Sequence, residues 1–301
     1  MSVNYKEMLV NYIDDIMESF KKQAIYIKQG TSEDIFRILT SRKFCYQSKK
    51  KTESAKKIIE KSIEIYLNQQ KPIKFIYNIG GGYHASLEPG KKDISFNIGL
   101  SELLLLYQIH RLHIEVSKKH KYGICFILGI SNLNAEALYN VPVSLTVGYA
   151  NQLRNLISSL NVFPATVLLE SEFCKSYNDR KRNEFKRPTE YELIQIKRFV
   201  GLSHENADFE NIQANYDWFR KLSRLNFSTV EDGIQISQRS NNGEISFRSY
   251  PGGDCKLQTG EVMLSLNSNN KIIPKLITSK TVKNFHKLVL DNCPVSLNVC
   301  I

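Results

Sequence analysis

Apolar residues recur every three or four positions through the first part of the chain, which indicates amphipathic helices. Gly30 is expected to end the first of these helices. Thr31 and Asp34 have the spacing of a capping box and predict a short second helix, and the pattern over 53–67 predicts a third. Residues 1–70 are therefore expected to form a helical preface. The positions expected to be buried are Met8, Leu9, Tyr12, Ile13, Ile16, Met17, Phe20, Ile59, Ile63, Tyr66 and Leu67.

The pattern then changes to short apolar runs that alternate with helical segments. The apolar runs cover 73–79, 123–130 and 165–170. Continuous apolar strands separated by helices are typical of a parallel sheet. The expected fold class is therefore α/β, with a Rossmann-like, mainly parallel sheet and helices on both of its faces. The intervening and following helices are expected over 100–120, 148–160, 189–201 and 209–225.

The last part of the chain alternates apolar and polar residues in strand fashion. Residues 233–250 form two such runs around Asn241, Asn242 and Gly243, which predicts an antiparallel hairpin. Two further short strands are expected within 256–266 and 271–277. The whole chain, 1–301, is expected to be a single α/β domain. It divides into the helical preface, a Rossmann-like core at 71–230 and a β-hairpin extension at 231–301 that extends or caps the main sheet.

Composition narrows the class of protein. With 301 residues and 42% hydrophobic content the chain can bury a full core. No apolar run approaches the roughly 18 residues of a membrane helix, and charges stand where a signal peptide would be apolar. A cytoplasmic protein with no membrane partner is expected. The six cysteines lie far apart without CxxC spacing, so reduced thiols are expected, with no metal and no cofactor.

The formal net charge of +11 has two readings. Its lysines and arginines gather at 41–57 and 177–187, where they either form solvated surface or attract an anion. The anion would be a phosphorylated metabolite or a nucleic acid. Neither cluster interleaves aromatic residues as a base-stacking surface does.

Three glycines directly after the first strand predict a binding loop. Ligands of open parallel sheets bind beyond the carboxyl ends of the strands, where Gly80, Gly81 and Gly82 are expected to lie. Glycine lets backbone amides approach a phosphate or carboxylate. A flexible turn is the alternative reading. The side chains expected beside these amides are those of His84, Ser86 and Lys91.

Glu102 is the leading catalytic candidate, with His84 as the second. Glu102 stands just inside a helix start, where the helix dipole alone favours a carboxylate. The alternative is that Glu102 takes a proton from an amine or a carbon acid. His110 and His113 are three residues apart on the same predicted helix, but no third ligand of clear spacing accompanies them.

Further substrate contacts are expected from a second strand end and from the last region. Ser131 and Asn132 follow the strand at 123–130, where they would orient a substrate carboxylate or form an Asx turn. Arg248 and Lys256 flank a Pro-Gly-Gly turn. Arg248 is either a bidentate clamp for phosphate or carboxylate, or a solvent-facing side chain.

The order of these parts resembles the isocyanide (isonitrile) synthases, the family of pyoverdine- and dityrosine-biosynthesis enzymes. The resemblance lies in "KPIKFIYNIGGGYHAS", "NIGLSELLLLYQIHRL", "YGICFILGISNL" and "YANQLRNL". It implies a Rossmann-like fold and a transferase or lyase that condenses the nitrogen of an amino acid with a sugar phosphate. In that picture the basic residues hold the phosphate and Glu102 moves protons. The chain departs from the family at 80–86 and at "ISNLN", where the family has proline-containing and Asp-Gly loops.

A second resemblance competes with the first. "GISNLN" is similar to the G-x-S-x-x-N segment of tRNA-dependent cyclodipeptide synthases, in which the serine carries the aminoacyl group. The net charge suits a tRNA partner. The leading hypothesis is a biosynthetic enzyme for an amino acid and a phosphorylated small molecule. A tRNA-dependent or other RNA-interacting protein, and a binding module without chemistry, remain alternatives.

Overall fold

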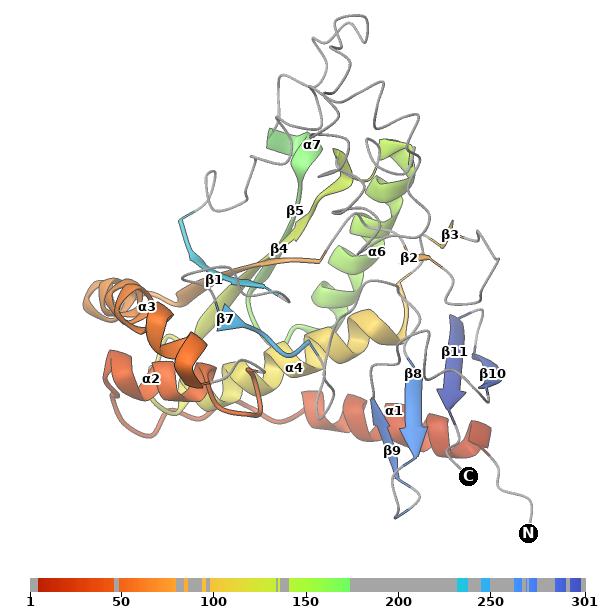
Figure 1. Cartoon of the computed structure of the whole chain (residues 1–301), viewed down its shortest axis with the longest axis horizontal. Helices are drawn as coiled ribbons and strands as arrows, with labels where there is room; N and C mark the ends of the chain where they lie inside the picture. The colour runs from red at the N-terminus through yellow and green to blue at the C-terminus, as the bar shows by residue number, and fades with distance from the viewer. Residues whose placement is uncertain are drawn as a thin grey trace, which may run out of the picture.

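The structure, a computed structural model, has layers of helices packed on a parallel sheet (Figure 1). It describes residues 5–45, 49–79, 84–85, 94–95, 98–133, 135, 141–173, 232–237, 245–249, 263–266, 269, 271–274, 285–290 and 293–298. No helix among these residues is long and apolar enough to cross a membrane.

The three predicted helices of the N-terminal region are confirmed as α1 (Tyr5–Phe20), α2 (Ser32–Leu39) and α3 (Lys49–Gln69). The first ends at Phe20, well before the predicted stop at Gly30. Gly30 instead donates its backbone N–H to the Lys119 carbonyl at 2.7 Å. The expected apolar face is buried at Leu9, Ile16 and Phe20 in α1, whereas Met17, which was also expected to be buried, is 41% exposed.

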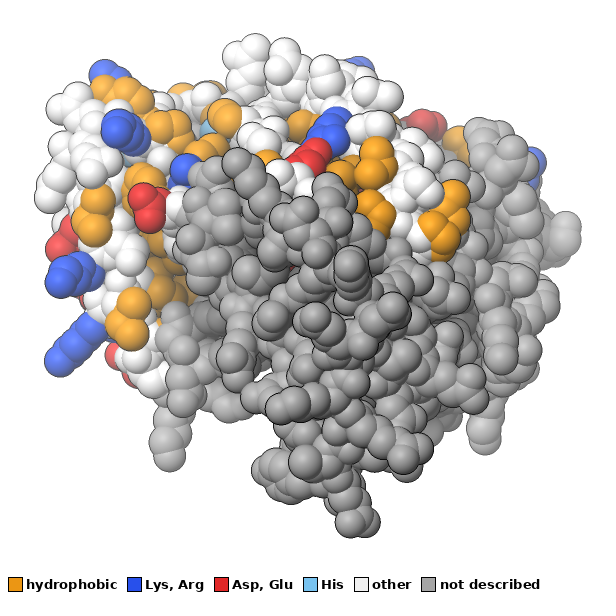
Figure 2. All heavy atoms as spheres, turned by 90° about the horizontal axis from the view of Figure 1, so that it is seen from above, with side chains coloured by type: hydrophobic (Ala, Val, Ile, Leu, Met, Phe, Trp, Pro, Cys, Tyr) orange, Lys and Arg blue, Asp and Glu red, His pale blue; other side chains and the backbone are white. Residues whose placement is uncertain are grey.

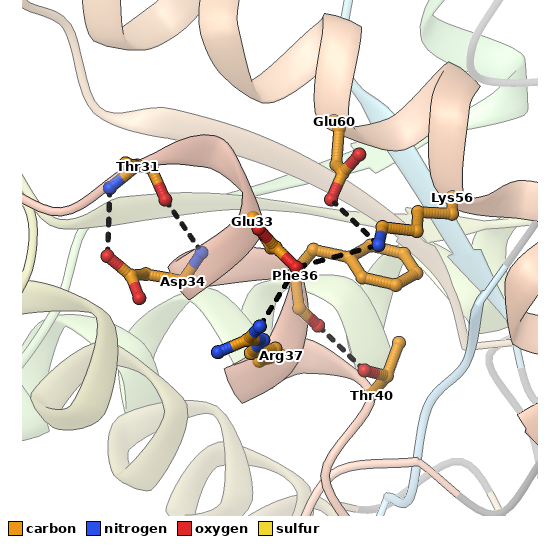
Figure 3. A network of polar contacts seen from close by, with 8 residues as sticks. All are labelled: Thr31, Glu33, Asp34, Phe36, Arg37, Thr40, Lys56 and Glu60. Atoms are coloured by element: carbon orange, nitrogen blue, oxygen red, sulfur yellow. Dashed lines mark hydrogen bonds and ion pairs between the residues drawn. The ribbon is translucent and has the colours of Figure 1, made fainter.

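The predicted capping box begins α2 (Figure 3). The Thr31 hydroxyl accepts from the Asp34 backbone N–H at 3.1 Å, and the Asp34 carboxylate accepts from the Thr31 N–H at 3.1 Å. Glu33 pairs with Arg37 in the same helix and with Lys56 of α3. These exposed pairs add little stability by themselves, and the attachment of α2 rests mainly on its buried apolar face.

The central sheet has the strand order β5-β4-β1-β6-β7, and all neighbours run parallel. Its strands are β1 (Ile73–Asn78), β4 (Ile124–Ile130), β5 (Ala165–Leu169), β6 (Ile234–Ser237) and β7 (Ile245–Ser246). The helices α4 (Leu100–Ser117), α6 (Val143–Leu160) and α7 (Glu170–Phe173) complete this part. The predicted α/β class with a mainly parallel sheet is confirmed.

One face of this sheet joins the helices in a single hydrophobic core. Phe75 of β1 and Phe126 of β4 lie side by side, with ring centroids 5.5 Å apart, and both are buried with residues of α1, α2, α3, α4 and α6. On the opposite face, Ile76 and Ile127 pack with Leu168 in a separate cluster. The helices predicted over 189–201 and 209–225 lie outside the described residues.

The predicted antiparallel hairpin at 233–250 is wrong. β6 and β7 pair in parallel, with Ile236 beside Ile245, and β6 also runs parallel to β1. An alternating pattern fixes which side chains share a face but not the direction of a strand. The two strands therefore continue the parallel sheet beyond β1, as members of the main sheet. The predicted turn at Asn241–Gly243 lies outside the described residues.

A second sheet follows with the order β10-β11-β8-β9. It contains β8 (Met263–Leu266), β9 (Ile272–Pro274), β10 (Phe285–Leu290) and β11 (Cys293–Asn298). The pairs β8–β9 and β10–β11 are antiparallel, whereas β11 and β8 are parallel. In Figure 1 this sheet lies beside α1, and β9 contacts that helix. A short antiparallel pair, β2 (His84–Ala85) and β3 (Ile94–Ser95), stands apart from both sheets.

Candidate functional site

The carboxyl ends of β1 and β4 lie side by side, as the sequence predicts. Asn78 is paired with Gly129 in the parallel register, and the Ile79 backbone N–H donates to the Gly129 carbonyl at 2.9 Å. The Asn78 side-chain amide then donates to the Ser131 hydroxyl at 2.7 Å. The chain therefore enters the triple-glycine segment next to the Ser131–Asn132 bend, at the edge where ligands of parallel sheets bind.

The bend itself is fixed to the end of β5. Asn132 is fully buried, and its amide nitrogen donates to the Ser171 hydroxyl at 2.9 Å while its oxygen accepts from the Ser171 backbone N–H at 3.1 Å. The buried Glu170 carboxylate accepts from the Leu133 backbone N–H at 3.1 Å. These contacts hold the ends of β4 and β5 together, so Asn132 has a clear structural role in addition to any contact with a ligand.

Sequence reasoning did not single out Asn78, Glu170 or Ser171. Asn78 is the last residue of β1, and Glu170 directly follows β5. Ligands of parallel sheets bind beyond the carboxyl ends of the strands, and this holds for the ends of β1 and β5 as it does for the end of β4. Polar residues at the end of an apolar run were therefore the signal that could have found them.

Glu102 lies at the start of α4 in a buried cluster of hydrogen-bond donors. Its Oε2 accepts from the Gly99 backbone N–H at 2.7 Å and from the Ser101 hydroxyl at 2.8 Å. Its Oε1 accepts from the Tyr149 hydroxyl of α6 at 3.0 Å. The residue as a whole is only 4% exposed. Glu102 thus caps the start of α4, which agrees with the interpretation that a carboxylate is favoured at a helix start. Its second oxygen, Oε1, accepts a hydrogen bond from α6.

Tyr149 is the partner that the sequence did not reveal as a site residue. It is buried, and its phenol donates to a carboxylate. Burial, the charge of Glu102 and the hydrogen bond to Glu102 raise the pKa of Tyr149 well above its ordinary value. The phenol therefore stays protonated at neutral pH and acts as a permanent donor to Glu102.

The helix that carries Tyr149 is tied to both of its neighbours. Gln152 accepts from the Ile98 backbone N–H at 3.3 Å, just before α4. Arg154 donates to the Val167 carbonyl at 2.9 Å and to Glu172 at 2.7 Å. The Tyr149–Arg154 segment therefore fixes α6 between the start of α4 and the end of β5.

Arg248 points to the helical region at the amino end of the chain. Its Nε donates to the Cys45 carbonyl at 3.1 Å, and its backbone N–H donates to the Phe44 carbonyl at 2.8 Å. The side chain is half-buried. These bonds fasten the segment after β7 to the segment after α2, and they orient one edge of the guanidinium.

The remaining predicted site residues fall largely outside the described part of the chain. The backbone of His84 pairs with Ser95 in β2–β3, but its side chain is not described. Among the described residues there is no group of three or more histidine, cysteine, aspartate or glutamate side chains suited to a metal ion. The site residues that lie outside are Gly80, Gly81, Gly82, Ser86, Lys91 and Lys256.

Comparison with known proteins identifies the fold. No protein-family model matches the sequence, and the search of curated proteins finds no match. The crystal structure of the PvcA protein from Pseudomonas aeruginosa superposes with a TM-score of 0.63 at 13% sequence identity. The match covers 89% of this chain and 99% of PvcA. The chain has the PvcA fold.

Proposed function

We propose that the protein is a biosynthetic enzyme of the isocyanide synthase type, acting on an amino acid and a phosphorylated small molecule. The observation that carries this proposal is the fold shared with PvcA over almost the full length of both chains. The isocyanide synthase type is taken from the sequence segments described above, which resemble that family. Fold alone does not determine function, so the proposal also depends on the residues at the strand ends.

Glu102 is proposed to move protons during the condensation. A general base needs a fixed position and a lone pair directed at the reacting group. The Gly99 N–H and the Ser101 hydroxyl hold Oε2, and the Tyr149 phenol holds Oε1 from one side. The carboxylate is thereby fixed in one orientation by donors from two elements, α4 and α6.

The anionic groups of the substrates are proposed to bind at the carboxyl ends of β1 and β4. The glycine segment would present backbone amides to a phosphate, and the Ser131–Asn132 bend would face the carboxylate of the amino acid. His84 is the second proposed acid–base group. The nitrogen of the amino acid would attack the carbonyl carbon of the sugar phosphate and release water. The proposed contacts to substrate are Gly80, Gly81, Gly82, Ser86, Lys91, Ser131, Asn132, Arg248 and Lys256.

A thermal-shift screen tests the proposed substrate class. A ligand that binds only the folded state raises the melting temperature with its concentration. We expect a rise with sugar phosphates, and a larger one when amino acids are added together with them. A rise with tRNA and none with any sugar phosphate would contradict the proposal.

The tRNA-dependent alternative makes a different prediction about salt. On the face shown in Figure 2, the described lysine and arginine side chains are interspersed with apolar and acidic ones and do not form a continuous basic strip. Binding to tRNA would weaken steeply as salt is raised, because many counterions are released from the phosphates. We expect the thermal shift caused by a sugar phosphate to depend much less on ionic strength.

A further inference from the structure

Three neighbouring apolar side chains project into solvent between α1 and α2. Ile25, Tyr26 and Ile27 are 66%, 44% and 67% exposed. Their segment runs along the lower edge of the molecule in Figure 1. Single exposed apolar residues are common on protein surfaces, but consecutive ones of this size point to a contact with another apolar phase.

The segment is held in place by backbone hydrogen bonds. The N–H groups of Ile27 and Lys28 donate to the Lys118 carbonyl at 3.1 and 3.2 Å, directly after α4. Gly30 donates to the Lys119 carbonyl. The apolar side chains are therefore presented to solvent by a fixed backbone.

Lysines lie on both sides of these apolar residues along the chain and in the segment that their backbone contacts. Three lysines flank the apolar residues along the chain, namely Lys21, Lys22 and Lys28. Three more belong to the segment after α4 that accepts the backbone hydrogen bonds, namely Lys118, Lys119 and Lys121. Lys21 pairs with Glu18, Lys118 pairs with Glu115, and Lys119 lies near Asp34. No carboxylate in the described part of the chain forms an ion pair with Lys22, Lys28 or Lys121. The surroundings of the apolar group therefore carry excess positive charge.

We propose that Ile25, Tyr26 and Ile27, with the surrounding lysines, form a surface anchor for a membrane rich in anionic phospholipid. Isoleucine and tyrosine side chains enter the boundary between headgroups and acyl chains, while lysines remain among the lipid phosphates. Each contribution is weak by itself, so the attachment is reversible. An anchor of this kind lies on the bilayer and needs no spanning helix. The sequence predicted no membrane partner because the chain lacks a spanning segment. That prediction therefore does not apply to an anchor that lies on the bilayer surface.

Other occupants fit the surface less well. A nucleic acid would use the lysines but gains nothing from exposed isoleucines. A stable protein partner buries about 800 Å² on each side and tends to avoid lysine, whereas the apolar group here is three residues long and set among lysines. A second copy of this chain would bring the same net charge of +11.

Vesicle sedimentation tests the anchor independently of enzymatic activity. The probes are vesicles of phosphatidylcholine with about one third phosphatidylserine, a fraction chosen to give an anionic surface, and vesicles of phosphatidylcholine alone. We expect the protein to bind the anionic vesicles at least tenfold more tightly. The double variant Ile25→Ser/Ile27→Ser should lose at least tenfold in binding to them, with an unchanged melting temperature because both side chains are exposed. Lys22→Gln/Lys28→Gln should weaken the binding to anionic vesicles only.

The matched control changes two exposed isoleucines of α3. Ile58→Ser/Ile65→Ser removes side chains that are 61% and 50% exposed and lie outside the proposed anchor. This control should bind vesicles as the parent protein does. The proposal is overturned if the parent protein binds neither kind of vesicle, or if both double isoleucine variants lose binding equally. It is also overturned if Ile25→Ser/Ile27→Ser changes only the oligomeric state.

Discussion

At the scale of single residues, the hydrogen bonds of Glu102 connect two parts of the chain that the sequence presents separately. The bond from Gly99 is local and follows from the position of a carboxylate in the first turn of a helix. The bond from Tyr149 spans 47 positions and depends on the packing of α6 against the start of α4. The sequence could therefore predict the first contact and not the second.

Removing the phenol of Tyr149 tests this contact. Tyr149→Phe keeps the ring but removes one hydrogen bond to Oε1 of a buried carboxylate, so we expect a loss of about 2 kcal/mol in the free energy of unfolding. Urea denaturation measures the change. Tyr122→Phe is the matched control, because the Tyr122 hydroxyl donates to Gln70 at an exposed position. Equal stabilities of the two variants would show that the bond from Tyr149 contributes nothing.

His113 gives the stability a predictable dependence on pH. Burial, together with the nearby His110, lowers the pKa of His113 from 6.5 to about 4, and burial also lowers the pKa of His110. The unfolded state therefore binds more protons than the folded state between these two pH values, so the stabilising effect of the neutral imidazole falls as pH decreases through that window.

We expect the free energy of unfolding to fall more steeply between pH 7 and about 4 in the parent protein than in His113→Gln, since the unfolded imidazole titrates in this range. Denaturation series at several pH values measure the two slopes. Parallel curves for the two proteins would contradict the assignment.

At the scale of elements, local signals were reliable where the element depends on local contacts. The capping box at Thr31 and the apolar periodicity over 53–67 both predicted helices that the structure contains. The strands within 73–79 and 123–130 were also predicted, because a continuous apolar run is visible in the local sequence. The direction of β7 was missed because it depends on its place beyond β6 in the main sheet, which neither strand encodes by itself.

The capping box makes a prediction for α2. Thr31→Ala removes the hydroxyl that accepts from Asp34, and we expect a loss of about 1 kcal/mol in the free energy of unfolding. Thr31→Ser retains the hydroxyl and should remain close to the parent protein. Chemical denaturation measures the free energy of unfolding of both variants. An equal loss in Thr31→Ser would show that the methyl group of Thr31, and not its hydroxyl, is responsible.

At the scale of the whole molecule, the parallel order of β5, β4, β1, β6 and β7 places the strand ends that carry the proposed site along one edge. The sequence predicted that the ends of β1 and β4 would be neighbours, because consecutive parallel strands are often adjacent. It could not predict that Asn132 would be held by Ser171, since that contact depends on β5 lying on the other side of β4. The fold shared with PvcA places this arrangement in a known architecture.

The measurement that most directly tests the proposed function follows two isotopes into one product. The protein is incubated with ¹⁵N-labelled amino acids and ¹³C-labelled sugar phosphates, and products are analysed by mass spectrometry. We predict a product that contains the amino acid nitrogen bonded to a carbon from the sugar phosphate. Glu102→Gln should reduce its formation by at least about 100-fold, the usual contribution of a general base, whereas the exposed Glu18→Gln should not. The absence of any doubly labelled product, or equal rates in Glu102→Gln and the parent protein, would contradict the account.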